Sequence, residues 1–122
     1  TDVTGFGLIG HATEIAVASG VSLEFEAGAV PLIDGVRELV RGNVPGGGRT
    51  NLKHFGGGVR MAESIAPDLA DQLYDPQTSG GLLVAIDPSA ASQAVEQLAA
   101  AGARGVVVGR VRAAGGSTIS VI

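Results

Sequence analysis

An aspartate precedes a glycine-rich turn at the very start of the sequence. Asp2 stands just before Thr4, Gly5 and Gly7, and a helical pattern begins directly after them. Free N–H groups at a helix start favour anions, and Mg²⁺ on phosphates uses one or two carboxylates together with phosphate oxygens. These residues therefore predict a magnesium–phosphate site. A structural alternative stays open, in which Thr4 caps the helix and the glycines permit close packing.

A second polar segment precedes an apolar run in the later half of the chain. Residues Asp75–Gly81 read Asp-Pro-Gln-Thr-Ser-Gly-Gly and lead into Leu82–Ile86. Uncharged donors and acceptors at the end of a sheet are placed where ligands tend to bind. The same composition is typical of a tight turn, and the residues alone leave the two interpretations open.

The third segment, Gly42–Gly58, contains seven glycines together with Arg49, Asn51, Lys53 and His54. Its composition predicts a long mobile loop whose cations could close over an anionic ligand. It matches neither common phosphate-binding glycine pattern, and a plain flexible loop explains it equally well. His54 and the other histidine, His11, have no partner at ligand spacing, which disfavours zinc.

Periodicity predicts the elements that position these segments. In chain order they are a helix within 1–20 that ends at Gly20, a half-buried strand over 21–26, a short helix over 33–41, helical pieces over 59–73, a central strand over 82–86 covered on both faces, a helix from 87 that ends at Gly102, and a hairpin of strands 105–112 and 117–122. Strands separated by helices, followed by a hairpin, predict a mixed sheet layered with helices.

Length and composition restrict the class of protein. The 122 residues are enough for one domain, and 45% hydrophobic with 16% charged residues excludes intrinsic disorder. A net charge of −4 leaves no basic field for nucleic acid. The absence of cysteine excludes a cysteine nucleophile or thiolate metal site within this chain. No apolar stretch reaches the length of a membrane helix, so we expect a soluble piece of a longer protein with no nucleic-acid or membrane partner.

Taken together, Thr1–His11, Pro45–Asn51 and Asp75–Leu83 resemble the selenophosphate synthetase (selenide, water dikinase) family, and the likeness extends over the whole chain. The resemblance implies that residues 1–122 are the C-terminal domain of a two-domain enzyme in the aminoimidazole ribonucleotide synthetase-like superfamily. It implies an α+β fold with a mixed, largely antiparallel sheet of about four strands, partly ferredoxin-like. The missing N-terminal domain would form a homodimer and bind ATP against this domain.

The resemblance also implies an activity, in which ATP, selenide and water give selenophosphate, AMP and phosphate in the cytoplasm. Asp2 matches the carboxylate that, with aspartates of the N-terminal domain, holds Mg²⁺ on the ATP phosphates. Thr4, Gly5 and Gly7 match the turn beside it and are expected to contact the bound nucleotide. The reactive cysteine or selenocysteine and the catalytic lysine belong to the N-terminal domain, so the fragment alone is expected to be inactive.

Two other functions remain open from the sequence. A sibling ATP-dependent enzyme of the same superfamily would share the fold and the metal carboxylate but use another acceptor. A non-catalytic ligand-binding module would instead bind its ligand without the N-terminal domain.

Overall fold

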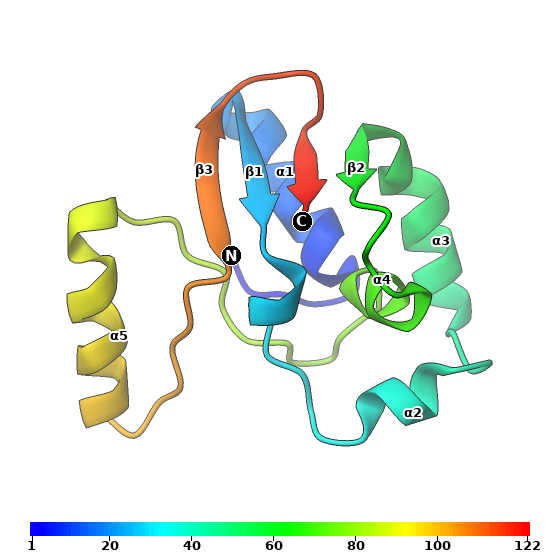
Figure 1. The fold of residues 1–122 in the computed structure, drawn as a ribbon, viewed down its shortest axis with the longest axis horizontal. Helices are drawn as coiled ribbons and strands as arrows, with labels where there is room; N and C mark the ends of the chain where they lie inside the picture. The colour runs from blue at the N-terminus through cyan, green and yellow to red at the C-terminus, as the bar shows by residue number, and fades with distance from the viewer.

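The computed structural model describes residues 1–122 and contains one four-stranded mixed sheet with helices around it (Figure 1). The elements are helices α1 (Gly7–Ser19), α2 (Val36–Val40), α3 (Gly46–Phe55), α4 (Pro67–Leu73) and α5 (Ala91–Ala100), strands β1 (Val21–Phe25), β2 (Val59–Met61), β3 (Gly109–Ala113) and β4 (Ile119–Val121), and 3₁₀ turns η1 (Ala27–Ala29), η2 (Gly56–Gly58) and η3 (Pro88–Ala90). The α+β class and the four-stranded mixed sheet are confirmed. None of the helices combines the length and the apolar character needed to cross a membrane.

Strand β1 lies inside the sheet, whose order is β2-β4-β1-β3. It pairs antiparallel with β3 and parallel with β4, and β2 also pairs parallel with β4. Two of the three pairings are thus parallel, and the expected largely antiparallel pairing is wrong. The expected hairpin is also wrong, because β1 separates β3 from β4. Ser22 of β1 holds the connection between them, donating to the Ser117 carbonyl (2.8 Å) and accepting from the Gly115 N–H (3.2 Å).

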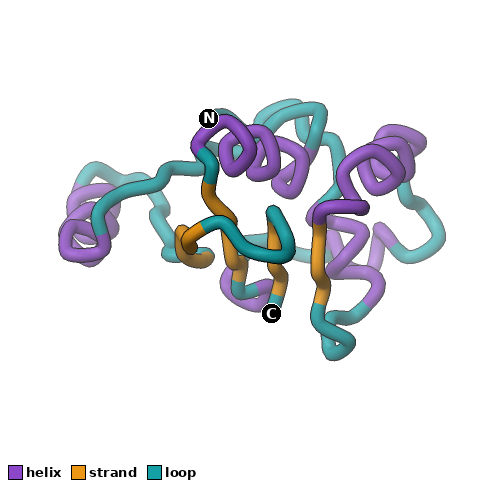
Figure 2. Tube along the Cα trace, turned by 90° about the horizontal axis from the view of Figure 1, so that it is seen from above, coloured by secondary structure: helices purple, strands orange, loops and turns teal.

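One face of the sheet forms the hydrophobic core with α1. Alternation along β1 turns Leu23 and Phe25 towards this face, while Glu24 lies on the other face and accepts from Arg112 (2.6 Å). Figure 2 shows α1 along one side of the strands and α5 separated from them, beyond the edge of the sheet that β3 forms. The buried cluster joins α1, β1, β4, η1, α3 and α4 through Ile9, Ala12, Ala16, Leu23, Phe25, Ala27, Phe55, Leu73, Tyr74, Ile119 and Val121.

The expected mobile loop over 42–58 is wrong, because most of it forms α3 and η2. Glycines weaken an isolated helix by about 1 kcal/mol each, but here they allow close packing. A Cβ at Gly47 would lie 2.9 Å from Cγ of Pro76. Residues Gly48, Asn51 and Phe55 recur at helical spacing and are all buried. Tertiary packing therefore outweighs the low intrinsic helix propensity of this segment.

The expected central strand over 82–86 is also wrong. Leu82 forms only an isolated antiparallel bridge with Asp2, and residues Leu82 and Val84 are 77% and 65% exposed. A strand of this apolar composition is buried only where layers cover both of its faces. The run lies outside the four-stranded sheet, and α5, which follows it in the chain, stands clear of the sheet (Figures 1 and 2).

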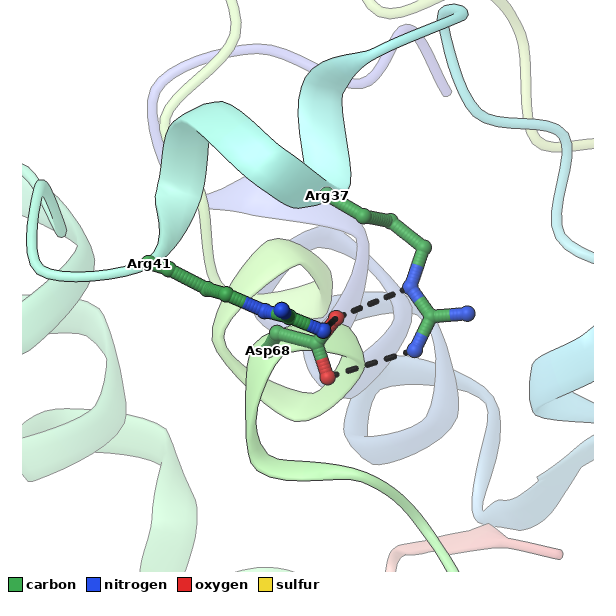
Figure 3. Close-up of polar contacts among 3 residues, drawn as sticks. All are labelled: Arg37, Arg41 and Asp68. Atoms are coloured by element: carbon green, nitrogen blue, oxygen red, sulfur yellow. Dashed lines mark hydrogen bonds and ion pairs between the residues drawn. The ribbon is translucent and has the colours of Figure 1, made fainter.

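An ion pair joins α2 to α4 at the periphery (Figure 3). Arg37 donates from Nε and Nη2 to the two carboxylate oxygens of Asp68, at 2.9 and 3.2 Å. Arg41 approaches the same carboxylate at 3.9 Å. The hydrogen bond from Arg37 lowers the pKa of Asp68 below its ordinary value of 3.8 and, with the charges of both arginines, outweighs the effect of burial.

Replacing Asp68 by asparagine is expected to remove an acid-sensitive part of the stability. A lowered pKa in the folded state means that the ion pair stabilises the fold above the unfolded-state pKa and ceases to do so as the pH falls through the folded-state value. In thermal unfolding from about pH 2 to 7, the melting temperature of Asp68→Asn should be lower than that of the wild type near neutrality. The two melting temperatures should become equal at the acid end of the range. A constant difference in melting temperature at every pH would contradict the assignment.

Candidate functional site

A polar pocket of about 240 Å³ lies where the beginning of the chain meets the later polar segment. It is lined by Asp2, Val3, Thr4, Thr78, Ser79, Gly80, Gly81 and Leu82. Two of the three segments singled out in the sequence, Asp2–Thr4 and the second half of Asp75–Gly81, are thus brought together. Asp2 is the only carboxylate in the lining, beside the hydroxyl-bearing Thr4, Thr78 and Ser79.

Backbone pairing holds the two walls of the pocket together. The Val3 N–H donates to the Gly81 carbonyl (2.8 Å), and the Gly80 N–H donates to the Val3 carbonyl (3.0 Å). The Gln77 N–H reaches the Thr4 carbonyl at 3.1 Å. A Cβ at Gly80 would lie 2.9 Å from the Val3 oxygen, so only glycine permits this approach. The Asp2 carboxylate is therefore carried on a paired segment of backbone.

The two glycines of the opening turn serve different structural purposes. Gly7 has φ of 70°, and a Cβ there would lie 2.8 Å from the Tyr74 carbonyl carbon. Gly7 therefore lets the start of α1 rest directly on the backbone just after α4, and it does not line the pocket. Gly5 has no heavy atom within 4 Å of the position a Cβ would take. Packing does not require glycine at position 5, and its predicted contact with nucleotide stays a prediction.

Thr4 does not cap the first helix as expected. Helix α1 begins at Gly7 after Phe6, without a side-chain cap. The Thr4 hydroxyl instead lies 3.0 Å from Nε2 of His11, one turn along α1. The ring of Phe6 packs against His11 with centroids 5.4 Å apart. His11 thus fixes the side chain of Thr4 at the pocket wall.

The segment Asp75–Gly81 divides into a supporting half and a pocket half. Gln77 Nε2 donates to Oδ2 of Asp75 at 2.6 Å. Burial raises the pKa of Asp75, and this hydrogen bond partly opposes the rise. Neither residue lines the pocket, whereas Thr78 and Ser79 do. The chemistry available from this segment therefore lies in its two hydroxyls.

The third segment contributes a buried amide, and none of its cationic side chains lines the pocket. Asn51 of α3 is 6% exposed, and its Nδ2 donates to the carbonyls of Gly5 and Tyr74, each at 2.9 Å. Arg49 donates to the Val44 carbonyl, and Lys53 lies in the last turn of α3. The sequence analysis places Asn51 in a loop. The i, i+3, i+7 spacing of Gly48, Asn51 and Phe55 is a signal for a buried helical face that includes Asn51, but it does not identify the hydrogen-bond partners.

The donor set suits one side of a magnesium–phosphate site. No group of three or more His, Asp and Glu side chains is arranged to hold a metal. One carboxylate with neighbouring hydroxyls fits Mg²⁺, which is commonly bound through one or two carboxylates plus phosphate oxygens and water.

Several curated proteins are similar in sequence to this chain, and each is a selenide, water dikinase. The protein from Clostridioides difficile is 40% identical over 124 residues, covering 100% of this chain and 36% of its own length. The protein from Nitratidesulfovibrio vulgaris is 44% identical over 112 residues, covering 91% of this chain and 32% of its own length. The protein from Bordetella bronchiseptica is 50% identical over 107 residues, covering 87% of this chain and 29% of its own length. The chain spans about a third of the length of these relatives.

The sequence profile of one domain family extends over the whole chain. It is described as AIR synthase related protein, C-terminal domain, and it matches residues 1–122. The chain therefore belongs to the family of AIR synthase related C-terminal domains.

Proposed function

We propose that this chain is the C-terminal part of a selenophosphate synthetase and forms one wall of its Mg-ATP site. The observation that carries the proposal is the position of Asp2. It is exposed, takes part in none of the three ion pairs, and lines a pocket shared with Thr78 and Ser79. The names of the relatives support the reaction, since each is a selenide, water dikinase.

In this proposal each wall of the pocket has its own task. Asp2 presents its carboxylate oxygens to Mg²⁺, and Thr78 and Ser79 donate their hydroxyls to phosphate oxygens. Thr4, Gly5 and Gly7 shape the turn beside the nucleotide. When bound, Mg²⁺ supplies neutralisation of the phosphate charge, and positioning and charge stabilisation are the main contributions to phosphoryl transfer.

The rest of the enzyme supplies the other components in this proposal. An N-terminal domain of the same polypeptide carries the remaining metal aspartates, the reactive cysteine or selenocysteine and the catalytic lysine, and it forms the homodimer. The full-length protein, called the parent enzyme below, converts ATP, selenide and water into selenophosphate, AMP and phosphate in the cytoplasm. The chain of 122 residues alone is inactive.

A sibling enzyme of the same superfamily is the second candidate, because the matching family profile is defined by AIR synthase related proteins. It would share this pocket and pass phosphate to another acceptor. ATP consumption by the parent enzyme, measured with selenide and with other acceptors, separates the two candidates. Selenide must stimulate consumption if the chain belongs to a selenophosphate synthetase.

The isolated chain is expected to bind Mg-ATP weakly, because Asp2 is the single carboxylate of the pocket. Titration calorimetry should show a dissociation constant above about 1 mM, equivalent to less than about 4 kcal/mol of binding free energy. Binding in the micromolar range by the chain alone would favour the non-catalytic binding module over a shared interdomain site.

A further inference from the structure

Three chain segments pack closely at a junction, backbone against backbone at Gly7 and backbone against the proline ring at Gly47. Gly7 rests on the backbone of Tyr74, and Gly47 rests on Pro76. A Cβ at either glycine would lie closer than 3.0 Å to a neighbouring atom. The junction therefore joins the opening turn, α3 and the start of Asp75–Gly81 with little room for side chains.

Asn51 is the polar side chain that reaches into this junction. Its Nδ2 donates to the Gly5 carbonyl on one side and to the Tyr74 carbonyl on the other, over 46 and 23 positions of sequence. Both partners are carbonyl oxygens, which only accept hydrogen bonds. The NH2 group of the Asn51 amide must therefore face them, and this fixes the orientation of the amide. A buried carbonyl left without its donor is costly. The Asn51 amide donates to one such carbonyl, that of Tyr74, and also binds the part-buried carbonyl of Gly5.

The two carbonyls flank the segments that build the pocket. Gly5 follows Thr4, whose carbonyl accepts from Gln77, and Tyr74 precedes the segment that runs through Gln77 to Gly80. A shift between Gly5 and Tyr74 is therefore transmitted to the Thr4–Gln77 and Val3–Gly80 hydrogen bonds. These are the bonds that hold the wall carrying Asp2 against the wall carrying the hydroxyls.

We propose that Asn51 is a positioning residue that sets the distance between the Asp2 wall and the Thr78–Ser79 wall of the pocket. This inference rests on the proposed Mg-ATP function for its catalytic consequence, whereas its structural consequence can be measured in this chain alone. Asn51 touches neither metal nor nucleotide in this proposal. It acts by holding Gly5 and Tyr74 at one separation.

The first test is amide hydrogen exchange, followed by NMR, in the chain of 122 residues. In Asn51→Ala, exchange at the Gln77 and Gly80 amides should accelerate at least about tenfold relative to the Leu23 amide, which donates to Thr118 across the sheet. Asn51→Ser, which keeps one donor, should show a smaller effect and guards against failure of the alanine variant to fold. Equal acceleration at all three amides would mean general destabilisation and would overturn the inference.

The second test is the Mg²⁺ dependence of the parent enzyme. Asn51→Ser should raise the Mg²⁺ concentration for half-maximal activity about tenfold, the low end of what loss of a supporting residue costs, with a smaller change in kcat. A merely structural role would lower kcat through the folded fraction and leave that concentration unchanged, which would overturn the inference. Asn43→Ser is the matched control, because the exposed Asn43 amide also donates to two carbonyls, those of Leu39 and Arg41, and none of these residues lines the pocket.

The two proposals fail in different ways. A wild-type parent enzyme without selenide-dependent ATP consumption contradicts the proposed function. The hydrogen-exchange measurement then still tests, independently of any activity, whether Asn51 holds the two walls of the pocket together. Normal wild-type activity with unchanged exchange and unchanged Mg²⁺ dependence in the variants contradicts the role of Asn51 alone.

Discussion

Asp2→Asn in the parent enzyme is expected to lower the rate of selenide-dependent AMP release by at least about 100-fold, since even residues that only support metal ligands cost about 10- to 100-fold. Asparagine keeps the size of the side chain and one oxygen but removes the negative charge that attracts Mg²⁺. The melting temperature should stay nearly constant, because Asp2 is exposed and in no ion pair. Exposed substitutions of this kind usually change stability by less than about 0.5 kcal/mol.

The control for this prediction is Asp34→Asn. Asp34 is an exposed aspartate in the turn before α2 and is absent from the pocket lining. It should leave AMP release within about twofold of the wild type, equivalent to about 0.4 kcal/mol. A near wild-type rate in Asp2→Asn would refute the role of Asp2, and equal losses in both variants would refute its specificity.

Gly7→Ala is expected to destabilise the fold by about 2 to 5 kcal/mol. A left-handed backbone conformation costs a residue with a Cβ about 1–2 kcal/mol. Forcing the backbone of α1 away from Tyr74 adds about 1–3 kcal/mol for overpacking. Urea unfolding followed by circular dichroism measures the free energy directly.

Gly20→Ala is the matched control at the opposite end of α1. Gly20 has φ of 64°, close to the 70° of Gly7, but no heavy atom lies within 4 Å of its Cβ position. It should therefore show only the conformational cost of about 1–2 kcal/mol. Equal losses at Gly7 and Gly20 would mean that the contact with Tyr74 contributes nothing to stability.

Local pattern predicted the parts of the fold whose structure is set locally. Strand β1 alternates apolar and polar residues and lies in the sheet as expected, with Leu23 and Phe25 buried. Helix α1 stops at Gly20 as the sequence predicted, and Gly20 has the left-handed conformation that ends many helices. In each case the sequence feature that determines the structure spans only a few residues. It is the period-two alternation in β1 and the glycine that follows α1.

The errors concern features set by distant contacts. Helix α3 was predicted to be a loop because its glycines are poor helix formers, and their packing on Pro76 cannot be inferred from local sequence. The strands β3 and β4 are joined by a short connection that favours a hairpin. Their separation by β1 rests on long-range contacts, the pairing of β1 with both strands and the hydrogen bond from Ser22 to the Ser117 carbonyl, 95 positions away.

The sequence predicted which residues form the candidate site better than it predicted how they are arranged in space. The sequence singled out Asp2 and Asp75–Gly81 separately, and backbone hydrogen bonds between Val3, Gly80 and Gly81 show why they form one pocket. The hydrogen bond of Thr4 to His11 and the two bonds of Asn51 depend on how the helices pack together. Those side-chain arrangements could not be derived from residue spacing.

The most direct test is ³¹P NMR of the parent enzyme incubated with Mg-ATP and selenide, compared between the wild type and Asp2→Asn. The account predicts that the wild type forms selenophosphate, AMP and phosphate in equal amounts. It predicts no detectable selenophosphate from Asp2→Asn at the same Mg²⁺ concentration. Consumption of ATP by the wild type without selenophosphate, or wild-type amounts of selenophosphate from Asp2→Asn, would contradict it.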